Sequence, residues 1–169
     1  MTESLRDIKR EYEGEEDRPL ASYLRVLTVY GGAVSVLLAA AKLAGRRAPE
    51  KISPMDILLM GLFTHRLSRT IAKDPVTSPI RAPFTRFDGV SGPAELREKV
   101  RSDGSGVRHA LGELLTCPFC LSQWVATGYA AGMVFSPKVT RMAGATMAAV
   151  AVSDWLQLAY TRLMKAASE

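Results

Sequence analysis

The chain of 169 residues contains only two cysteines, Cys117 and Cys120, which excludes a secreted scaffold held by several disulfides. Residues 1–20 are polar throughout and contain no early apolar core, so they do not have the pattern of a signal peptide. The net charge is +5, but the bases do not form a dense tract with aromatic residues beside it. We therefore expect no nucleic acid among the partners.

Long uncharged stretches stand out against this background. Apolar residues make up 47% of the chain and charged residues 23%, averages that suit a soluble protein as well as a membrane protein. The charges are segregated, however, and the ranges 26–41 and 114–137 carry none. As a helix the second range would be about 36 Å long at 1.5 Å per residue. That length is enough to cross a bilayer.

These stretches predict an all-α integral membrane helical bundle with about four transmembrane helices. Ser53 and Pro54 predict the start of the second helix, as a cap and a first-turn proline. A soluble helical bundle is the alternative. The predicted parts are a polar cytosolic arm at 1–20 and a single membrane domain at 21–169, with spans near 24–43, 54–72, 117–136 and 139–161 and a cytosolic segment at 73–113.

Local patterns also predict the form of the cytosolic segment. Prolines at 75, 79 and 83 cannot continue a helix at that spacing, so we expect an extended chain there. The stretch "SGPAELREKVR" predicts a short exposed helix with Pro93 near its start. With four spans, most of the 22 Lys and Arg residues fall on one side. Because positive residues mark the cytoplasmic side, we predict that both termini are cytosolic.

The cysteine pair allows three interpretations. Cys117 and Cys120 are small residues that pack where a helix begins, or an activated thiol, or two ligands of a zinc or iron site. The motif "CPFC" looks like the active-site motif of glutaredoxins, and Pro118 predicts a helix that begins at Cys117. The chain lacks the strand–helix alternation of that fold. A metal site needs further ligands, for which Glu113, His109 or a second copy of the motif are the candidates.

Ionisable residues inside apolar segments are costly and need partners. In the predicted topology Asp154 lies at the depth of Arg66 and Arg69. We therefore predict an intramembrane ion pair of Asp154 with Arg69 or with Arg66. Its role would be to fix helix register, with a proton or ion relay as the alternative.

Small residues recur in the last two apolar segments, at Gly128 and Gly132 and again at Gly144 and Ala148. Such residues let helices approach closely. We predict that the third span packs on the fourth, in preference to dimerisation through the same face. Trp124 and Trp155 lie within these segments and not at their ends, so we interpret them as packing residues.

Three segments taken in order resemble a known family. They are "GLFTHRLSRTIAKDPVTSPIRAPF", "GELLTCPFCLSQWVA" and "AVSDWLQLAY", and they are similar to small bacterial membrane proteins catalogued as domain of unknown function 1360. The resemblance covers roughly 54–161 and implies a multi-pass protein of the bacterial cytoplasmic (inner) membrane. Some members are labelled sporulation proteins. The matching positions are Arg66, Arg69, Asp74, Pro79, Arg81, Pro83, Glu113, Cys117, Cys120, Trp124 and Asp154.

No reaction or substrate follows from these residues. Asp74, Arg81 and Glu113 suggest a polar cluster on the cytosolic side. We interpret the chain as a non-enzymatic inner-membrane protein that acts through interactions at the cytoplasmic face, with the lipid bilayer and itself or another membrane protein as partners. One alternative is a thiol-redox or metal-binding protein that uses its two cysteines. The other is a small transporter or channel component that uses Asp154 and Arg69.

Overall fold

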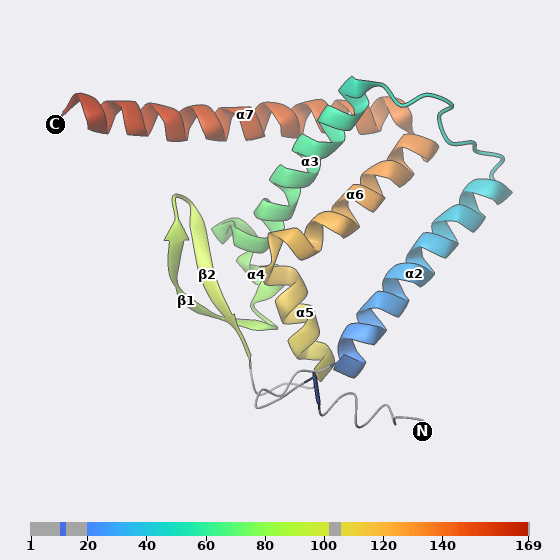
Figure 1. The fold of residues 1–169 in the computed structure, drawn as a ribbon, viewed down its shortest axis with the longest axis horizontal. Helices are drawn as coiled ribbons and strands as arrows, with labels where there is room; N and C mark the ends of the chain where they lie inside the picture. The colour runs from blue at the N-terminus through green and yellow to red at the C-terminus, as the bar shows by residue number, and fades with distance from the viewer. Residues whose placement is uncertain (1–10, 13–19, 102–105, 169) are drawn as a thin grey trace.

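The computed structural model describes residues 11–12, 20–101 and 106–168, and its described part is chiefly helical with one small sheet (Figure 1). Strands β1 (Thr85–Gly92) and β2 (Glu95–Val100) pair as an antiparallel hairpin. The remaining elements are α2 (Leu20–Leu43), α3 (Pro54–Lys73), the 3-10 turn η1 (Pro75–Thr77), α4 (Ser78–Arg81), α5 (Gly106–Thr116), α6 (Pro118–Phe135) and α7 (Pro137–Ala167).

Two helix starts follow directly from local sequence. Ser53 caps α3 and forms a reciprocal capping box with Asp56, and Pro54 occupies the first turn. Cys117 caps α6, where its sulfur accepts a hydrogen bond from the backbone nitrogen of Cys120 at 3.2 Å. Both predicted starts are confirmed.

The predicted bundle of about four transmembrane helices is wrong. Within the described residues, α2 is the one helix that is long and apolar enough to cross a membrane, as judged by length and composition. The second half of α3 is basic, and α7 carries Asp154 and several bases. Helix α6 is uncharged, but it has only 18 residues and includes Ser122, Gln123 and Thr127. The prediction that both termini are cytosolic assumed an even number of crossings and loses its basis.

The predicted helix around Pro93 is also wrong, because this stretch forms the hairpin. Pro93 and Ala94 make the turn, where Ala94 has a φ of 56°. In β2 the exposed residues Arg97 and Lys99 alternate with half-buried neighbours. This period of two is that of a strand, and it overrides the helical propensity of the residues.

The prolines at 75, 79 and 83 mark short helical turns and not the extended chain that we predicted. Pro75 opens η1 and Pro79 lies in the first turn of α4. Proline is accepted in a first turn because the missing N–H has no partner there in any case. The spacing of four residues therefore separates two consecutive single turns.

The core of the described chain lies where α3 packs against both α6 and α7. Figure 1 shows α7 crossing α3 and running on past the rest of the fold to the C-terminus. The side chains buried in the core are mostly small, so the helices approach closely. The buried apolar residues are Ala72, Ala110, Leu121, Tyr129, Ala148 and Ala151.

Small residues bring α6 and α7 together, as the sequence predicted, but at particular positions. A Cβ on Gly144 would lie 2.4 Å from the hydroxyl oxygen of Tyr129, and one on Gly132 would lie 2.6 Å from Thr140 Oγ1. A Cβ on Gly128 would meet nothing within 4 Å. The predicted packing is therefore confirmed at Gly132 and Gly144 and does not involve Gly128.

We expect Gly144→Ala to lower the free energy of unfolding by about 1–3 kcal/mol, because the new methyl group overpacks the contact with Tyr129. Gly128→Ala is the matched control and should be neutral or stabilising by up to about 1 kcal/mol, since alanine is the better helix former. Urea unfolding of both variants, followed by circular dichroism, makes the comparison. Equal effects at the two glycines would contradict this account of the packing.

Candidate functional site

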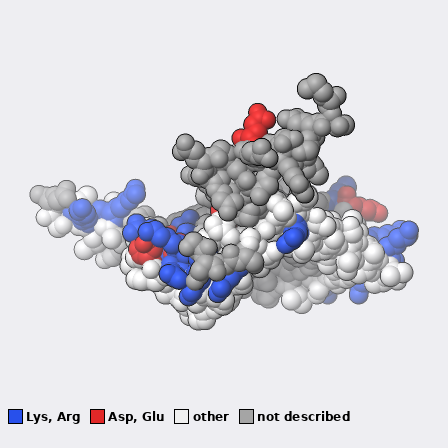
Figure 2. Space-filling model, turned by 90° about the horizontal axis from the view of Figure 1, so that it is seen from below, with Lys and Arg blue, Asp and Glu red and all other residues white. Residues whose placement is uncertain are grey.

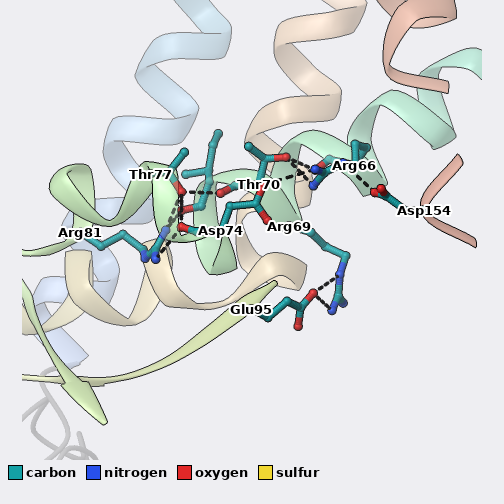
Figure 3. A network of polar contacts seen from close by, with 9 residues as sticks. Arg66, Arg69, Thr70, Asp74, Thr77, Arg81, Glu95 and Asp154 are labelled. Atoms are coloured by element: carbon teal, nitrogen blue, oxygen red, sulfur yellow. Dashed lines mark hydrogen bonds and ion pairs between the residues drawn. The ribbon is translucent and has the colours of Figure 1, made fainter. Parts of the chain in front are cut away.

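A network of ion pairs joins the second half of α3 to the hairpin, to η1 and to α7 (Figure 3). Arg66, Arg69 and Lys73 recur at helical spacing and form one stripe along α3. Asp74 caps the C-terminal end of the helix. The stripe thus places two guanidinium groups where elements distant in sequence can reach them.

Arg81 is the most deeply buried member of this region, with a side chain that is 0% exposed. Its Nε and Nη2 donate to the two carboxylate oxygens of Glu98, each at 2.9 Å. Nη1 donates to the Ile71 carbonyl and to Thr77 Oγ1, both at 2.7 Å, and Nη2 also reaches the Asp74 carbonyl at 3.1 Å. The buried charge is therefore paired with a carboxylate and bonded to the end of α3.

Glu98 is ionised in this setting. Burial by itself raises the pKa of its carboxyl, but the hydrogen bonds from Arg81 and from the Thr85 hydroxyl together outweigh burial, so the pKa lies below its usual value. Thr85 Oγ1 donates at 2.9 Å. The pair is thus fully charged at neutral pH, and it ties β1 and β2 to α4.

Arg66 lies between two carboxylates. Its Nη2 is 3.2 Å from Asp74 Oδ2 and its Nη1 donates to Thr70 Oγ1 at 2.7 Å. Its Nε lies 2.9 Å from Asp154 Oδ2 on α7, an ion-pair distance. The Nε–H makes no hydrogen bond, however, so the contact with Asp154 is electrostatic and not directional.

Arg69 pairs with Glu95 at the start of β2, through Nη2 and through Nε at 3.0 Å. Figure 3 shows this pair standing apart from the group formed by Arg66 and its partners. Of the two pairings that the sequence allowed for Asp154, the structure therefore brings it to Arg66. A role of this pair in a relay or in helix register stays a prediction.

Between α3, the hairpin turn and α7 lies a cleft of about 420 Å³. His65 and Trp155 form part of its wall, with their ring centroids 5.7 Å apart. Burial first, and then the charges of Arg69 and Arg66, lower the pKa of His65 below its ordinary value. His65 is therefore neutral at pH 7.

The predicted polar cluster comes together only in part. Arg81 contacts the Asp74 carbonyl, whereas Glu113 lies on α5, where the Tyr23 hydroxyl donates to its Oε2 at 2.5 Å. His109 Nε2 is 3.4 Å from Glu113 Oε1, one turn away on the same helix. Glu113 thus links α5 to α2 and does not join the network on α3.

Both cysteines are free thiols at the start of α6. Cys120 is exposed as a residue, yet burial of its sulfur in the wall between α2, α5 and α6 is the largest cause that raises its pKa to about 11. The hydrogen bond to Cys117 and the charges of Cys117 and Glu113 raise the pKa further. Cys120 is therefore a poor nucleophile at neutral pH.

The metal interpretation lacks a complete ligand set in the part of the chain that the structure describes. No three His, Cys, Asp or Glu side chains gather there in an arrangement that could hold a metal ion. Zinc or iron at Cys117 and Cys120, with Glu113 and His109, stays a prediction. It would need ligands beyond this group.

Several residues that build the network were not predicted from the sequence. Glu95 and Glu98 were assigned to an exposed helix, and only their place in a strand brings them to Arg69 and Arg81. A further pair joins the starts of α3 and α7, where Arg141 Nε lies 2.7 Å from Asp56 Oδ1. The hydrogen bond from Arg141, followed by that from Ser53, holds the pKa of Asp56 down at about 2.

Over the described residues, these features define a helical protein with one candidate membrane helix and an ion-paired cleft beside a small hairpin. The chain belongs to the family described as protein of unknown function DUF1360, whose profile matches residues 59–160. The match begins within α3 and ends within α7, and so contains Arg66, Arg69, Arg81 and their carboxylate partners.

The chain is also similar to the Sporulation protein YjcA of Bacillus subtilis (strain 168), with 30% identity over 76 residues. The matched segment is 44% of this chain and 64% of that protein, so less than two thirds of the relative is covered. No solved structure matches the chain.

We expect Arg81→Met to lower the free energy of unfolding by about 3–5 kcal/mol, because it leaves the Glu98 carboxylate buried without a counter-charge. Arg97→Met is the matched control. It removes an exposed pair with Asp88 and should cost less than about 1 kcal/mol. Urea denaturation followed by circular dichroism measures both. The idea fails if the two variants are equally stable.

Alkylation should reveal the raised pKa of Cys120. Two pKa units above an ordinary thiol correspond to a thiolate fraction, and thus a reaction rate with iodoacetamide, lower by roughly 100-fold at pH 8. The rate should keep rising as the pH passes 10. Peptide mapping by mass spectrometry follows Cys120 alone, with free glutathione as the reference thiol. Modification of Cys120 at the glutathione rate at pH 7 would contradict the raised pKa, and a faster rate would support an activated thiol.

Proposed function

We propose that this chain is a membrane-anchored, non-enzymatic protein in which α2 is the anchor and the region around the cleft contacts a partner at the cytoplasmic face. The observation that carries the proposal is the exposure of α2. None of the most apolar window of this helix is buried inside the protein. Apolar surface of that extent is stable in water only when something covers it.

One side of α2 is held against the rest of the fold by polar contacts. The Tyr30 hydroxyl lies 2.8 Å from Thr127 Oγ1 and accepts a hydrogen bond from Gln123 at 2.7 Å. The Tyr30 ring also meets Trp124 edge-on at 5.1 Å. The apolar side chains left exposed on α2 include Leu24, Leu27, Val29, Val36 and Leu38.

The distribution of charge supports an anchored protein. Figure 2 shows Lys and Arg side chains in separate groups, with largely uncharged surface between them. The guanidinium groups of Arg66 and Arg69 on α3 and of Arg81 on α4 each have a carboxylate partner. Such mutual pairing is what a structural or docking surface needs, and it favours an interaction role over acid–base chemistry.

The cytoplasmic side is proposed because Cys117 and Cys120 are free, and thiols persist in a reducing compartment. The name of the Bacillus subtilis relative suggests a process, spore formation, in which such an interaction would matter. A partner could be a second copy of this chain or another membrane protein.

The anchor is tested with the double variant Val29→Asp and Val36→Asp, which places charge on exposed positions of α2. Each aspartate should oppose membrane insertion by about 2.5–3.5 kcal/mol near the middle of the helix. The full chain should stay in bacterial membranes after an alkaline carbonate wash, whereas the double variant should appear in the wash. Immunoblots of the two fractions measure the distribution.

The matched control is the double variant Val76→Asp and Val139→Asp, which makes the same change at exposed valines outside α2. It should stay with the membrane. In intact cells a membrane-impermeant maleimide should label neither cysteine until the cells are lysed. The proposal is wrong if the unmodified chain is removed by carbonate, or if both double variants behave alike.

A further inference from the structure

The cleft between α3, the hairpin turn and α7 has walls of two kinds. One part is aromatic, from Trp155 and His65, and the other is formed by ion-paired side chains. The volume of about 420 Å³ is enough for a small organic molecule. The cleft exists only in the folded chain, because its lining residues come from α3, the hairpin and α7.

The charges that line the cleft do not balance. Three carboxylates, from Asp74, Glu95 and Asp154, face the two guanidinium groups of Arg66 and Arg69. His65 adds no charge at pH 7, since burial and the two arginines lower its pKa. The cleft therefore carries one negative charge in excess.

The excess is located at Asp154. Arg66 already contacts Asp74, and its Nε lies near Asp154 without a hydrogen bond. The Asp154 side chain is 43% exposed, compared with 22% for Glu95 and 17% for Asp74. Asp154 thus retains acceptor capacity toward the cleft.

Trp155 follows Asp154 in the chain and also lines the cleft. Trp155 is 48% exposed, so part of its indole ring is open to a ligand. A tryptophan face beside a carboxylate is a favourable environment for an ammonium group, through cation–π attraction and Coulomb attraction together. An anion would meet the excess negative charge.

We propose that the cleft binds a small organic cation, an amine or a methylated ammonium group, between the indole ring of Trp155 and the carboxylates of Asp154 and Glu95. The cation is held by its charge and by the ring. It is either a free amine or the headgroup of a lipid. This inference goes beyond the anchoring role of α2 and does not depend on it.

The test uses the full chain in an uncharged maltoside detergent and the fluorescence of Trp155. The sequence has two tryptophans, so all proteins carry Trp124→Phe to isolate the signal. Choline chloride and ethanolamine hydrochloride should change the emission saturably at constant ionic strength. Sodium phosphate and the uncharged carbon isostere of choline should not.

Asp154→Asn should weaken choline binding by roughly tenfold or more, about 1.4 kcal/mol in affinity terms. The fold should persist, because Arg66 keeps Asp74 as its partner. Asp88→Asn is the matched control, since it makes the same change on the hairpin, where Asp88 pairs with Arg97 and Lys99. This control should bind choline normally, and melting curves verify that both variants are folded.

Soluble headgroups distinguish the two sources of the cation. Glycerophosphocholine should bind more tightly than choline if the site is made for a lipid headgroup, and more weakly if it is made for a free amine. The proposal is overturned if neither binds, if the uncharged isostere binds equally well, or if Asp154→Asn has no greater effect than Asp88→Asn. None of these outcomes depends on whether carbonate removes the chain from membranes.

Discussion

The buried guanidinium of Arg81 is the constraint on which the arrangement of the described fold depends. A charge with no exposed surface is tolerated only when a counter-charge and hydrogen bonds replace water. Glu98 supplies the charge, while the carbonyls of Ile71 and Asp74 supply the bonds. The hairpin must therefore lie against the end of α3. Because Glu98 is held there, Glu95, three residues nearer the turn, lies within reach of Arg69.

The opposite wall of the cleft depends on close helix packing. Gly132 and Gly144 let α6 and α7 approach until side chains meet backbone. Figure 1 shows α7 crossing α3. The approach to α6 and the pair of Arg141 with Asp56 both hold α7 in this position, in which Asp154 lies beside Arg66. The shape of the cleft thus depends on two requirements. One is electrostatic and acts between the β-hairpin and α3, and the other is steric and acts between α6 and α7.

How far the sequence could predict these features depended on the range of the interaction. The caps at Ser53 and Cys117 were predictable because a cap involves residues within one turn. The hairpin was not, because Glu98 finds its partner 17 residues earlier and only when its segment is extended. The four spans failed for another reason. The range 114–137 carries no charge, but the helix α6 within it has only 18 residues and includes Ser122, Gln123 and Thr127.

The number of carboxylates around Arg66 separates a structural role from an additional one. Neutralising one guanidinium needs one carboxylate. Asp74 already supplies it to Arg66 from the end of the same helix. Asp154 approaches from α7 at an ion-pair distance without aligning to the Nε–H, and it stays the more exposed of the two. Its exposed carboxylate beside an open indole ring therefore exceeds what neutralising Arg66 requires, and that surplus is what gives the cleft its preference for positive charge.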